Sequence, residues 1–168
     1  FLPGEWPDML DKFKDECGVF GIINHPEASN MTYLGLYALQ HRGQESAGIA
    51  SSDGAGIRVT KAMGYVNEVF NTEMLSQLPG HIAMGHVRYS TAGESRLANA
   101  QPIVVDSVHG QLAVGHNGNI VNATELREAL VRTGAIFQAT TDTEVVVHLF
   151  ARSREVAEGG RGDPQHAA

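Results

Sequence analysis

The sequence predicts an α+β domain, in which helices cover antiparallel sheets. Short apolar runs at 17–23, 47–52, 57–62, 81–89 and 111–115 predict strands. Helical patterns fall between the first two runs and again after the last one. The strands and helices do not alternate regularly, as they do in parallel α/β folds, so hairpin connections and antiparallel sheets are expected.

The first strand is predicted from Cys17 to Ile23, where glycines between apolar side chains allow another backbone to come close. From Asn30 to Gln40 the residues predict a helix that is apolar on most sides, which is typical of a helix between two layers. Asp53-Gly54 then marks the turn of a hairpin.

Two later helices begin at candidate capping boxes. Asn122 and Thr141 each stand three residues before a glutamate, and an apolar pattern follows. The first of these helices is expected to end near Gly134, and the second continues through the apolar run 145–150.

Three regions are predicted along the chain. Residues 1–16 are acidic and contain prolines, and we interpret them as a leader or propeptide. Residues 17–154 form one domain. Residues 155–168, rich in glycine, alanine and charge, are expected to be an irregular tail.

Composition and charge exclude several classes of function. With 42% hydrophobic and 18% charged residues, the chain is typical of a soluble globular domain. A formal net charge of −7 argues against nucleic acid or an anionic membrane as a partner. No apolar run has the length of a membrane helix and no signal peptide is apparent, so a cytoplasmic location is expected.

Cys17 is the only cysteine, and its position allows two interpretations. A free cysteine is usually a small buried apolar side chain. Cleavage of the Glu16–Cys17 bond would instead make it the first residue. Its α-amino group, with a pKa of about 7.7 to 8.0, could then take the proton of the thiol.

Two polar segments follow strands or helices. Arg88, near the end of a predicted strand, could form two hydrogen bonds with a carboxylate or could make an internal salt bridge. The segment from Gln40 to Gly48, which contains Arg42 and Gly43, could be a surface turn or part of a site.

Asn117-Gly118 is first a hairpin signal. The amide of Asn117 and the N–H of Gly118 could also converge on an oxygen that carries negative charge in a tetrahedral intermediate. Asp142 suits the first turn of a helix, where the dipole favours an acid, and could equally hold an ammonium group.

The eight histidines show no metal-binding spacing, so no metal site is predicted.

Taken in order, five segments resemble the class II glutamine amidotransferases with an N-terminal nucleophile, and most closely the amidophosphoribosyltransferase family. The segments are Cys17-Gly18-Val19-Phe20-Gly21, Gln40-His41-Arg42-Gly43-Gln44, Gly85-His86-Val87-Arg88-Tyr89, His116-Asn117-Gly118-Asn119 and Thr141-Asp142-Thr143-Glu144. The glucosamine-6-phosphate synthase family shares several of these elements and is the nearest alternative. A catalytically silent fragment or interaction module is the alternative from another class.

The resemblance implies the N-terminal-nucleophile hydrolase fold, a four-layer αββα sandwich of antiparallel sheets that would be incomplete in this chain. It also implies that Cys17 attacks the side-chain amide of glutamine and forms a glutamyl thioester. Asn117 and Gly118 would form the oxyanion hole. With residues 1–16 attached, the chain would be an inactive precursor.

For substrate binding, the resemblance implies that Arg88 holds the α-carboxylate of L-glutamine and Asp142 its α-ammonium group. Arg42 and Gly43 would shape the pocket beside the nucleophile.

In the longer enzyme, ammonia would convert phosphoribosyl pyrophosphate to phosphoribosylamine, in the first step of purine synthesis. That reaction implies magnesium, and some members also hold a 4Fe-4S cluster, whereas no cofactor is expected in this chain. The full-length protein is expected to be a homo-oligomer.

Overall fold

The computed structural model describes residues 17–42, 45–89, 96–107 and 110–159 of the chain. The strands are β1 (Gly18–Ile23), β2 (Ser46–Ser52), β3 (Ile57–Met63), β4 (Ile82–Arg88), β5 (Ile103–Ser107) and β6 (Gly110–Val114). The α-helices are α1 (Ala28–Ala38), α2 (Val66–Val69), α3 (Thr72–Ser76), α4 (Ala123–Arg132) and α5 (Thr143–Gly159). Two 3-10 turns are η2 (Gln40–Arg42) and η3 (Leu97–Asn99).

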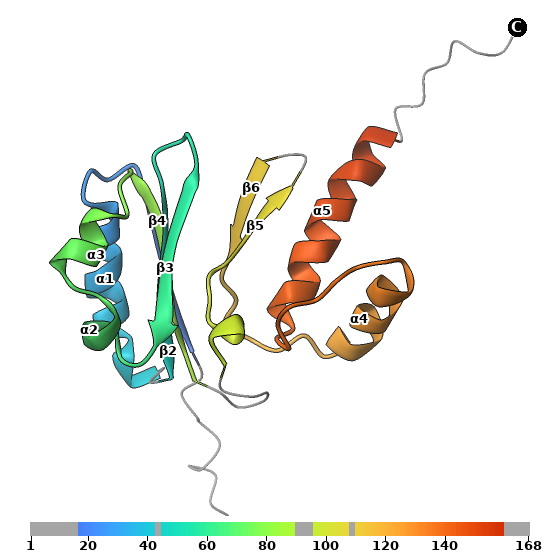
Figure 1. Cartoon of the computed structure of the whole chain (residues 1–168), viewed down its shortest axis with the longest axis horizontal. Coiled ribbons are helices and arrows are strands. Elements are labelled where there is room, and N and C mark those ends of the chain that lie inside the picture. Colours follow the sequence, from blue (N-terminus) through green and yellow to red (C-terminus); the bar gives the residue numbers. More distant parts are fainter. Residues whose placement is uncertain (1–16, 43–44, 90–95, 108–109, 160–168) are drawn as a thin grey trace, which may run out of the picture.

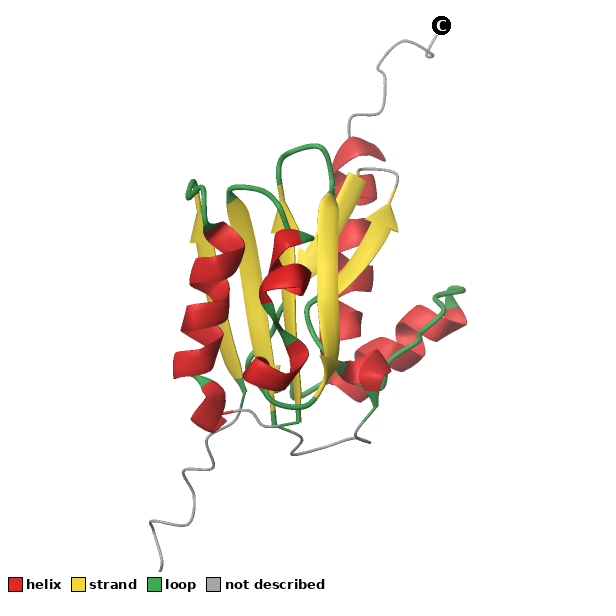
Figure 2. Ribbon diagram, turned by 60° about the vertical axis from the view of Figure 1, so that its left-hand side comes forward, coloured by secondary structure: helices red, strands yellow, loops and turns green. Residues whose placement is uncertain are grey.

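The elements form four layers (Figure 1). Four antiparallel strands make the larger sheet, in the order β1-β4-β2-β3, and β5 pairs with β6 in a second, two-stranded sheet. Helices α1, α2 and α3 cover the outer face of the larger sheet, whereas α4 and α5 lie beyond the smaller one (Figures 1 and 2). This arrangement confirms the predicted α+β class and the antiparallel sheets.

The main apolar core lies between the larger sheet and its helices. Its buried members come from α1, α2, the strands and the segment after α3: Leu36, Ala47, Ile49, Val66, Val69, Phe70, Leu78 and Val87. Helix α1 comes close to β1 because Gly35 has no side chain; a Cβ there would lie 2.4 Å from the ring of Phe20. The outer face of α1 is not covered by another layer, since Leu34 and Tyr37 are exposed there. The prediction that this helix lies between two layers was wrong in this respect.

The other face of the larger sheet meets the segment that leads into β5. A Cβ added to Gly48 would lie 2.2 Å from the main-chain oxygen of Gln101, so only glycine allows this approach. The ammonium group of Lys61 adds two hydrogen bonds, donating to the oxygen of Ala100 at 2.6 Å and to that of Pro102 at 3.2 Å. Burial lowers the pKa of Lys61.

His86 is a fully buried residue of β4 on this same face, next to Gly48 in the strand register. Its Nε2 donates to the main-chain oxygen of His116 at 3.1 Å, since a carbonyl can only accept. Burial is the main cause that lowers the pKa of His86 from 6.5 to about 4. The ring is therefore neutral at pH 7.

Several element boundaries differ from the predictions. Asn122 precedes α4, but its side chain makes no capping bond because its φ of −108° and ψ of 23° are not the extended values that a capping side chain needs. Glu144 accepts from the N–H groups of Gln138 and Ala139, and the predicted box with Thr141 is wrong. The strand β5 and the short helices α2 and α3 were not predicted.

The irregular tail was predicted to begin at residue 155, which is a further correction. Helix α5 continues to Gly159. Glutamate and alanine favour a helix in residues 155–158, and the helix ends at Gly159. Residues 160–168 and the predicted leader 1–16 lie outside the described residues.

Among the residues that the structure describes, none of the helices combines the length and the apolar character that crossing a membrane requires.

We predict that Gly48→Ala lowers the free energy of unfolding by about 1–3 kcal/mol, because the new Cβ would overlap a main-chain oxygen. Gly21→Ala is the matched control, since it lies in the same sheet and an added Cβ would have no atom within 4 Å. Urea unfolding followed by circular dichroism measures both variants. Equal stability of the two would contradict the proposed close approach.

We also predict that the fold loses stability as pH falls from 6.5 toward 4. In this range His86 binds a proton in the unfolded chain but not in the folded one, so acid favours unfolding. One pH unit corresponds to about 1.4 kcal/mol, so this residue alone should cost about 2 kcal/mol by about pH 5. Urea unfolding at several pH values should show a shallower pH dependence for His86→Gln, and equal slopes would refute the assignment.

Candidate active site

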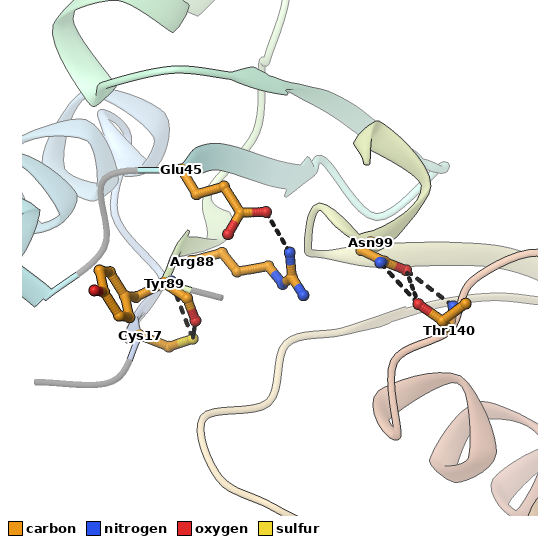
Figure 3. A network of polar contacts seen from close by, with 6 residues as sticks. All are labelled: Cys17, Glu45, Arg88, Tyr89, Asn99 and Thr140. Carbon is orange, nitrogen blue, oxygen red and sulfur yellow. Dashed lines mark hydrogen bonds and ion pairs between the residues drawn. The ribbon is translucent and has the colours of Figure 1, made fainter. Parts of the chain in front are cut away.

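Cys17 lies immediately before β1, where that strand runs beside the end of β4. Its φ is 44°, in the left-handed region that residues with a side chain seldom adopt. The sulfur contacts the main chain of Tyr89, whose N–H lies 3.5 Å and whose oxygen lies 3.6 Å away (Figure 3). The thiol is partly exposed. The interpretation of Cys17 as a fully buried apolar side chain is therefore wrong.

The carbonyl oxygen of Cys17 accepts two hydrogen bonds from distant parts of the chain. Arg42, at the end of η2, donates through Nε at 2.9 Å. Asn117 donates through its side-chain amide at 3.3 Å. Two of the predicted site residues thus contact the main chain of the predicted nucleophile. Gly43, predicted to lie beside it, is outside the described residues.

Arg88 is 5% exposed at the end of β4. Its Nη1 lies 2.5 Å from Oε1 of Glu45 (Figure 3). The N–H of Glu45 also donates to the main-chain oxygen of Arg88 at 3.0 Å. The internal salt bridge considered from the sequence is therefore present. Arg88 also lines the pocket that contains Cys17.

The segment from His116 to Gly118 follows β6 and lies beside Cys17. Gly118 has a φ of 156°, and a Cβ at this position would lie 2.9 Å from Nε2 of His116. Both main-chain polar groups of His116 are hydrogen-bonded. Its N–H donates to Oε1 of Gln101 at 2.7 Å, and its oxygen accepts from Nε2 of His86. The loop that contains Asn117 and Gly118 is therefore fixed at its first residue.

Asp142 precedes α5 rather than lying in its first turn. Its Oδ2 accepts from the N–H of Ile120 at 2.8 Å, and its Oδ1 lies 3.7 Å from Nδ1 of His116. The backbone before it is held by Arg127, which donates to the oxygens of Ala139 at 3.0 Å and Thr141 at 2.8 Å.

The segment before Asp142 is also bonded to η3. The side chains of Asn99 and Thr140 are joined at 2.9 Å, and the N–H of Thr140 donates to the same Asn99 side chain at 2.9 Å (Figure 3). Asn99 is 1% exposed, so these bonds are protected from water.

One pocket of about 370 Å³ brings Cys17, Arg88, Gly118 and Asp142 together. The volume is at the lower end of the range for small-molecule sites. The residues that line the pocket therefore include a cysteine, an arginine, an aspartate and a glycine. These are the groups needed to attack the neutral end of a small zwitterion while holding its charged end.

A larger hollow of about 730 Å³ lies between β5 and α5 and is lined mainly by aliphatic side chains. It contains none of the predicted site residues. We therefore place the candidate active site in the smaller pocket, on chemical grounds.

The described residues include no group of three or more His, Cys, Asp or Glu side chains that could hold a metal ion. The magnesium and iron–sulfur groups that the resemblance implies for the longer enzyme thus find no fitting set of ligands in the described part of the chain.

Sequence reasoning missed three polar residues that line or support the pocket. Gln101 stands in a part of the sequence for which no strand or helix was predicted. Glu45 was noted only as part of a polar stretch. Arg127 belongs to a predicted helix in which an arginine would normally face solvent. Only the tertiary contacts reveal their positions. Near these residues, the glycine and two amides of the Asn117–Asn119 segment were a strong local signal.

The profile of the glutamine amidotransferase domain family matches residues 72–157, about half of the chain. The amidophosphoribosyltransferase of Rhizobium etli is 50% identical over 161 residues, which cover 95% of this chain and 32% of that protein. The amidophosphoribosyltransferase of Bacillus subtilis is 51% identical over 149 residues, which cover 86% of this chain and 31% of that protein. The chain thus spans about a third of these relatives' length.

Two solved structures have a similar fold. One is described as the allosteric regulatory enzyme of purine biosynthesis, with a TM-score of 0.76 and 50% identity over 80% of this chain and 29% of that one. The other is a glutamine phosphoribosylpyrophosphate amidotransferase from B. subtilis complexed with ADP and GMP, with a TM-score of 0.74 and 49% identity over the same shares. Together with the match of the family profile, these similarities in sequence and fold show that the chain belongs to the glutamine amidotransferase domain family.

Proposed function

We propose that the pocket beside Cys17 hydrolyses the side-chain amide of L-glutamine. The observation that carries this proposal is the convergence of Cys17, Arg88, Gly118 and Asp142 on one small pocket. Glutamine has a charged α-carboxylate and α-ammonium group at one end and a neutral amide at the other. A site for it therefore needs a cation, an anion and a nucleophile, each at its own place.

In the reaction, the thiolate of Cys17 attacks the carbon of the amide and forms a carbon–sulfur bond. The carbonyl oxygen carries the negative charge of the tetrahedral intermediate. When the intermediate collapses, the carbon–nitrogen bond breaks and ammonia leaves after taking a proton. Water then hydrolyses the thioester, which releases glutamate and restores the thiol.

The base that we propose is the α-amino group of Cys17 itself. In the printed chain this nitrogen belongs to the peptide bond with Glu16 and cannot accept a proton. Cleavage of that bond would produce an amine with a pKa of about 7.7 to 8.0, close enough to neutrality to act as a general base. The printed chain is therefore proposed to be an inactive precursor.

The oxyanion would be stabilised by the N–H of Gly118 and the side-chain amide of Asn117. The position of Asn117 supports this role, because its amide nitrogen already lies 3.3 Å from the carbonyl oxygen of Cys17. In the water-poor surroundings of a bound substrate, such fixed donors are worth several kcal/mol of barrier.

For the charged end of glutamine, we propose that Arg88 binds the α-carboxylate and Asp142 the α-ammonium group. Glu45 holds Arg88 in place through its Nη1, and a guanidinium group has five N–H donors in all. Arg42, which bonds to the Cys17 carbonyl, would help to shape the site beside the nucleophile.

In the longer protein, we propose that the released ammonia reacts with phosphoribosyl pyrophosphate to form phosphoribosylamine for purine synthesis. The similarity to proteins named amidophosphoribosyltransferase favours this acceptor over the sugar phosphate of a glucosamine-6-phosphate synthase. Magnesium would serve that second reaction. A cytoplasmic homo-oligomer is our expectation for the complete protein.

We predict that the protein beginning at Cys17 releases ammonia from glutamine, whereas protein that retains residues 1–16 does not. Only a free α-amino group can act as the base. Intact mass identifies the first residue, a coupled glutamate dehydrogenase assay measures ammonia, and Cys17→Ala beginning at the same position is the negative control. A folded protein with a free Cys17 and no ammonia release would instead support the silent interaction module.

We predict that Asn117→Ala lowers kcat for glutamine hydrolysis by about 10²–10³-fold, equivalent to about 2.7–4 kcal/mol, with little change in KM. The amide would stabilise the transition state and not the bound substrate. Steady-state kinetics test this, with Asn67→Ala as control because Asn67 is exposed on α2, on the far side of the larger sheet. A rise in KM at unchanged kcat would assign Asn117 to substrate binding instead.

A further inference from the structure

The side chain of Gln101 connects the two segments that contain the polar groups of the pocket. It is 5% exposed and lies between η3 and β5. Its Oε1 accepts from the N–H of His116 at 2.7 Å, and its Nε2 donates to Oγ1 of Thr143 at 3.0 Å. His116 directly precedes Asn117 and Gly118, and Thr143 directly follows Asp142.

The backbone that carries this side chain cannot shift easily. The oxygen of Gln101 lies against Gly48 in the larger sheet. The residues on both sides, Ala100 and Pro102, are buried, and their oxygens accept hydrogen bonds from Lys61 of β3. A residue held by the sheet on both sides presents its amide in a fixed place.

His116 is held at its oxygen as well as at its N–H. The second partner is His86, which is buried in β4 and donates through Nε2. The two bonds come from different directions in the fold, one from the larger sheet and one from the segment before β5. They fix the residue from which the oxyanion-hole loop starts.

Thr143 is fully buried at the start of α5. Its hydroxyl oxygen accepts a hydrogen bond from Nε2 of the Gln101 amide. A movement of Gln101 would therefore affect both the segment of His116 and that of Thr143. Removing the amide would leave a partly buried N–H on His116 and a buried hydroxyl group on Thr143 without this partner, which favours rearrangement of both.

We infer that Gln101 is a positioning residue, which keeps the oxyanion-hole loop and Asp142 at the correct separation. This inference rests on the proposed glutaminase function. Gln101 lines the pocket, but the amide groups that would otherwise reach a substrate are occupied by His116 and Thr143. A misplacement of about 1 Å can cost about 10²-fold in rate.

The test uses the protein encoded by the complete gene, beginning at Cys17. Gln101→Met keeps the length of the side chain and removes both hydrogen bonds. We expect kcat for glutamine hydrolysis to fall by about 10–100-fold because the oxyanion-hole loop shifts, and KM for glutamine to rise because Asp142 shifts as well. Gln111→Met is the matched control, because Gln111 also bridges two segments through its amide but lies outside the pocket. Its kcat should be unchanged.

A second readout separates positioning from general damage. Alkylation of Cys17 by iodoacetamide displaces iodide from an sp³ carbon and forms no oxyanion. The alkylation rate of Gln101→Met should therefore stay within about twofold of the wild type while glutamine hydrolysis falls. An equal loss in both reactions would overturn the inference and assign Gln101 a merely structural role.

Conservative variants provide the rescue. Gln101→Glu keeps an acceptor for the N–H of His116 and an acceptor for the hydroxyl hydrogen of Thr143, so it should recover most of the activity that Gln101→Met loses. If Gln101→Met does not fold, Gln101→Glu and Thr143→Val are compared instead. A loss of kcat is then expected for Thr143→Val and not for Gln101→Glu. Wild-type kcat in Gln101→Met, or unchanged kcat in a folded Thr143→Val, would overturn the proposal.

The failure of this inference is distinguishable from failure of the proposed function. If the wild-type protein with a free Cys17 releases no ammonia, the glutaminase proposal fails before any variant is compared. If the wild type is active and Gln101→Met equals it, only the positioning role of Gln101 is refuted.

Discussion

The contact between the main-chain oxygen of Gln101 and the bare backbone of Gly48 sets how close the two sheets lie. The larger sheet lies on one side of this contact. Cys17 directly precedes its strand β1, and Arg88 is the last residue of its strand β4. On the other side are β5, β6 and the loops that present Gly118 and Asp142. A pocket assembled from both halves requires a fixed distance between them. A glycine in one strand and a clamped segment opposite it provide that distance.

Much of the fold could be predicted because its signals are local. The hairpin around Asp53-Gly54 could be predicted because an aspartate side chain in a turn commonly accepts a hydrogen bond from an N–H two residues later. In the structure, Asp53 accepts such a bond from the N–H of Ala55 at 2.9 Å. The positions of α1, α4 and α5 also followed from periodicity, although the predicted caps of α4 and α5 were wrong. Asn122 has the right chemistry for a cap but the wrong backbone angles, and angles are set by the loop it belongs to. β5 was missed although it pairs with β6, the next strand in the chain, because its five residues show no clear alternation of apolar and polar side chains.

The site was predictable only where its residues belong to distinctive segments. Cys17, Arg88, Gly118 and Asp142 stood out in the sequence, and the structure brings them to one pocket. Glu45 and Gln101 did not stand out in the sequence. A glutamate in a polar turn and a glutamine before a proline are common, and the neighbouring residues do not indicate a role in a site. Their roles depend on contacts that span 43 residues in the case of Glu45 with Arg88 and 42 residues in that of Gln101 with Thr143. Sequence patterns of short range cannot reveal such pairs.

The two donors on the Cys17 carbonyl have a consequence for the chain end that the proposed cleavage would create. Polypeptide termini are ordinarily among the loosest parts of a domain. Here the oxygen of Cys17 is tethered by Arg42 and Asn117, and the next residue already belongs to β1. Scission ahead of Cys17 would thus liberate its nitrogen but leave its carbonyl anchored. Such a terminus is ordered before any substrate arrives, so little conformational entropy remains to be lost when the reaction begins.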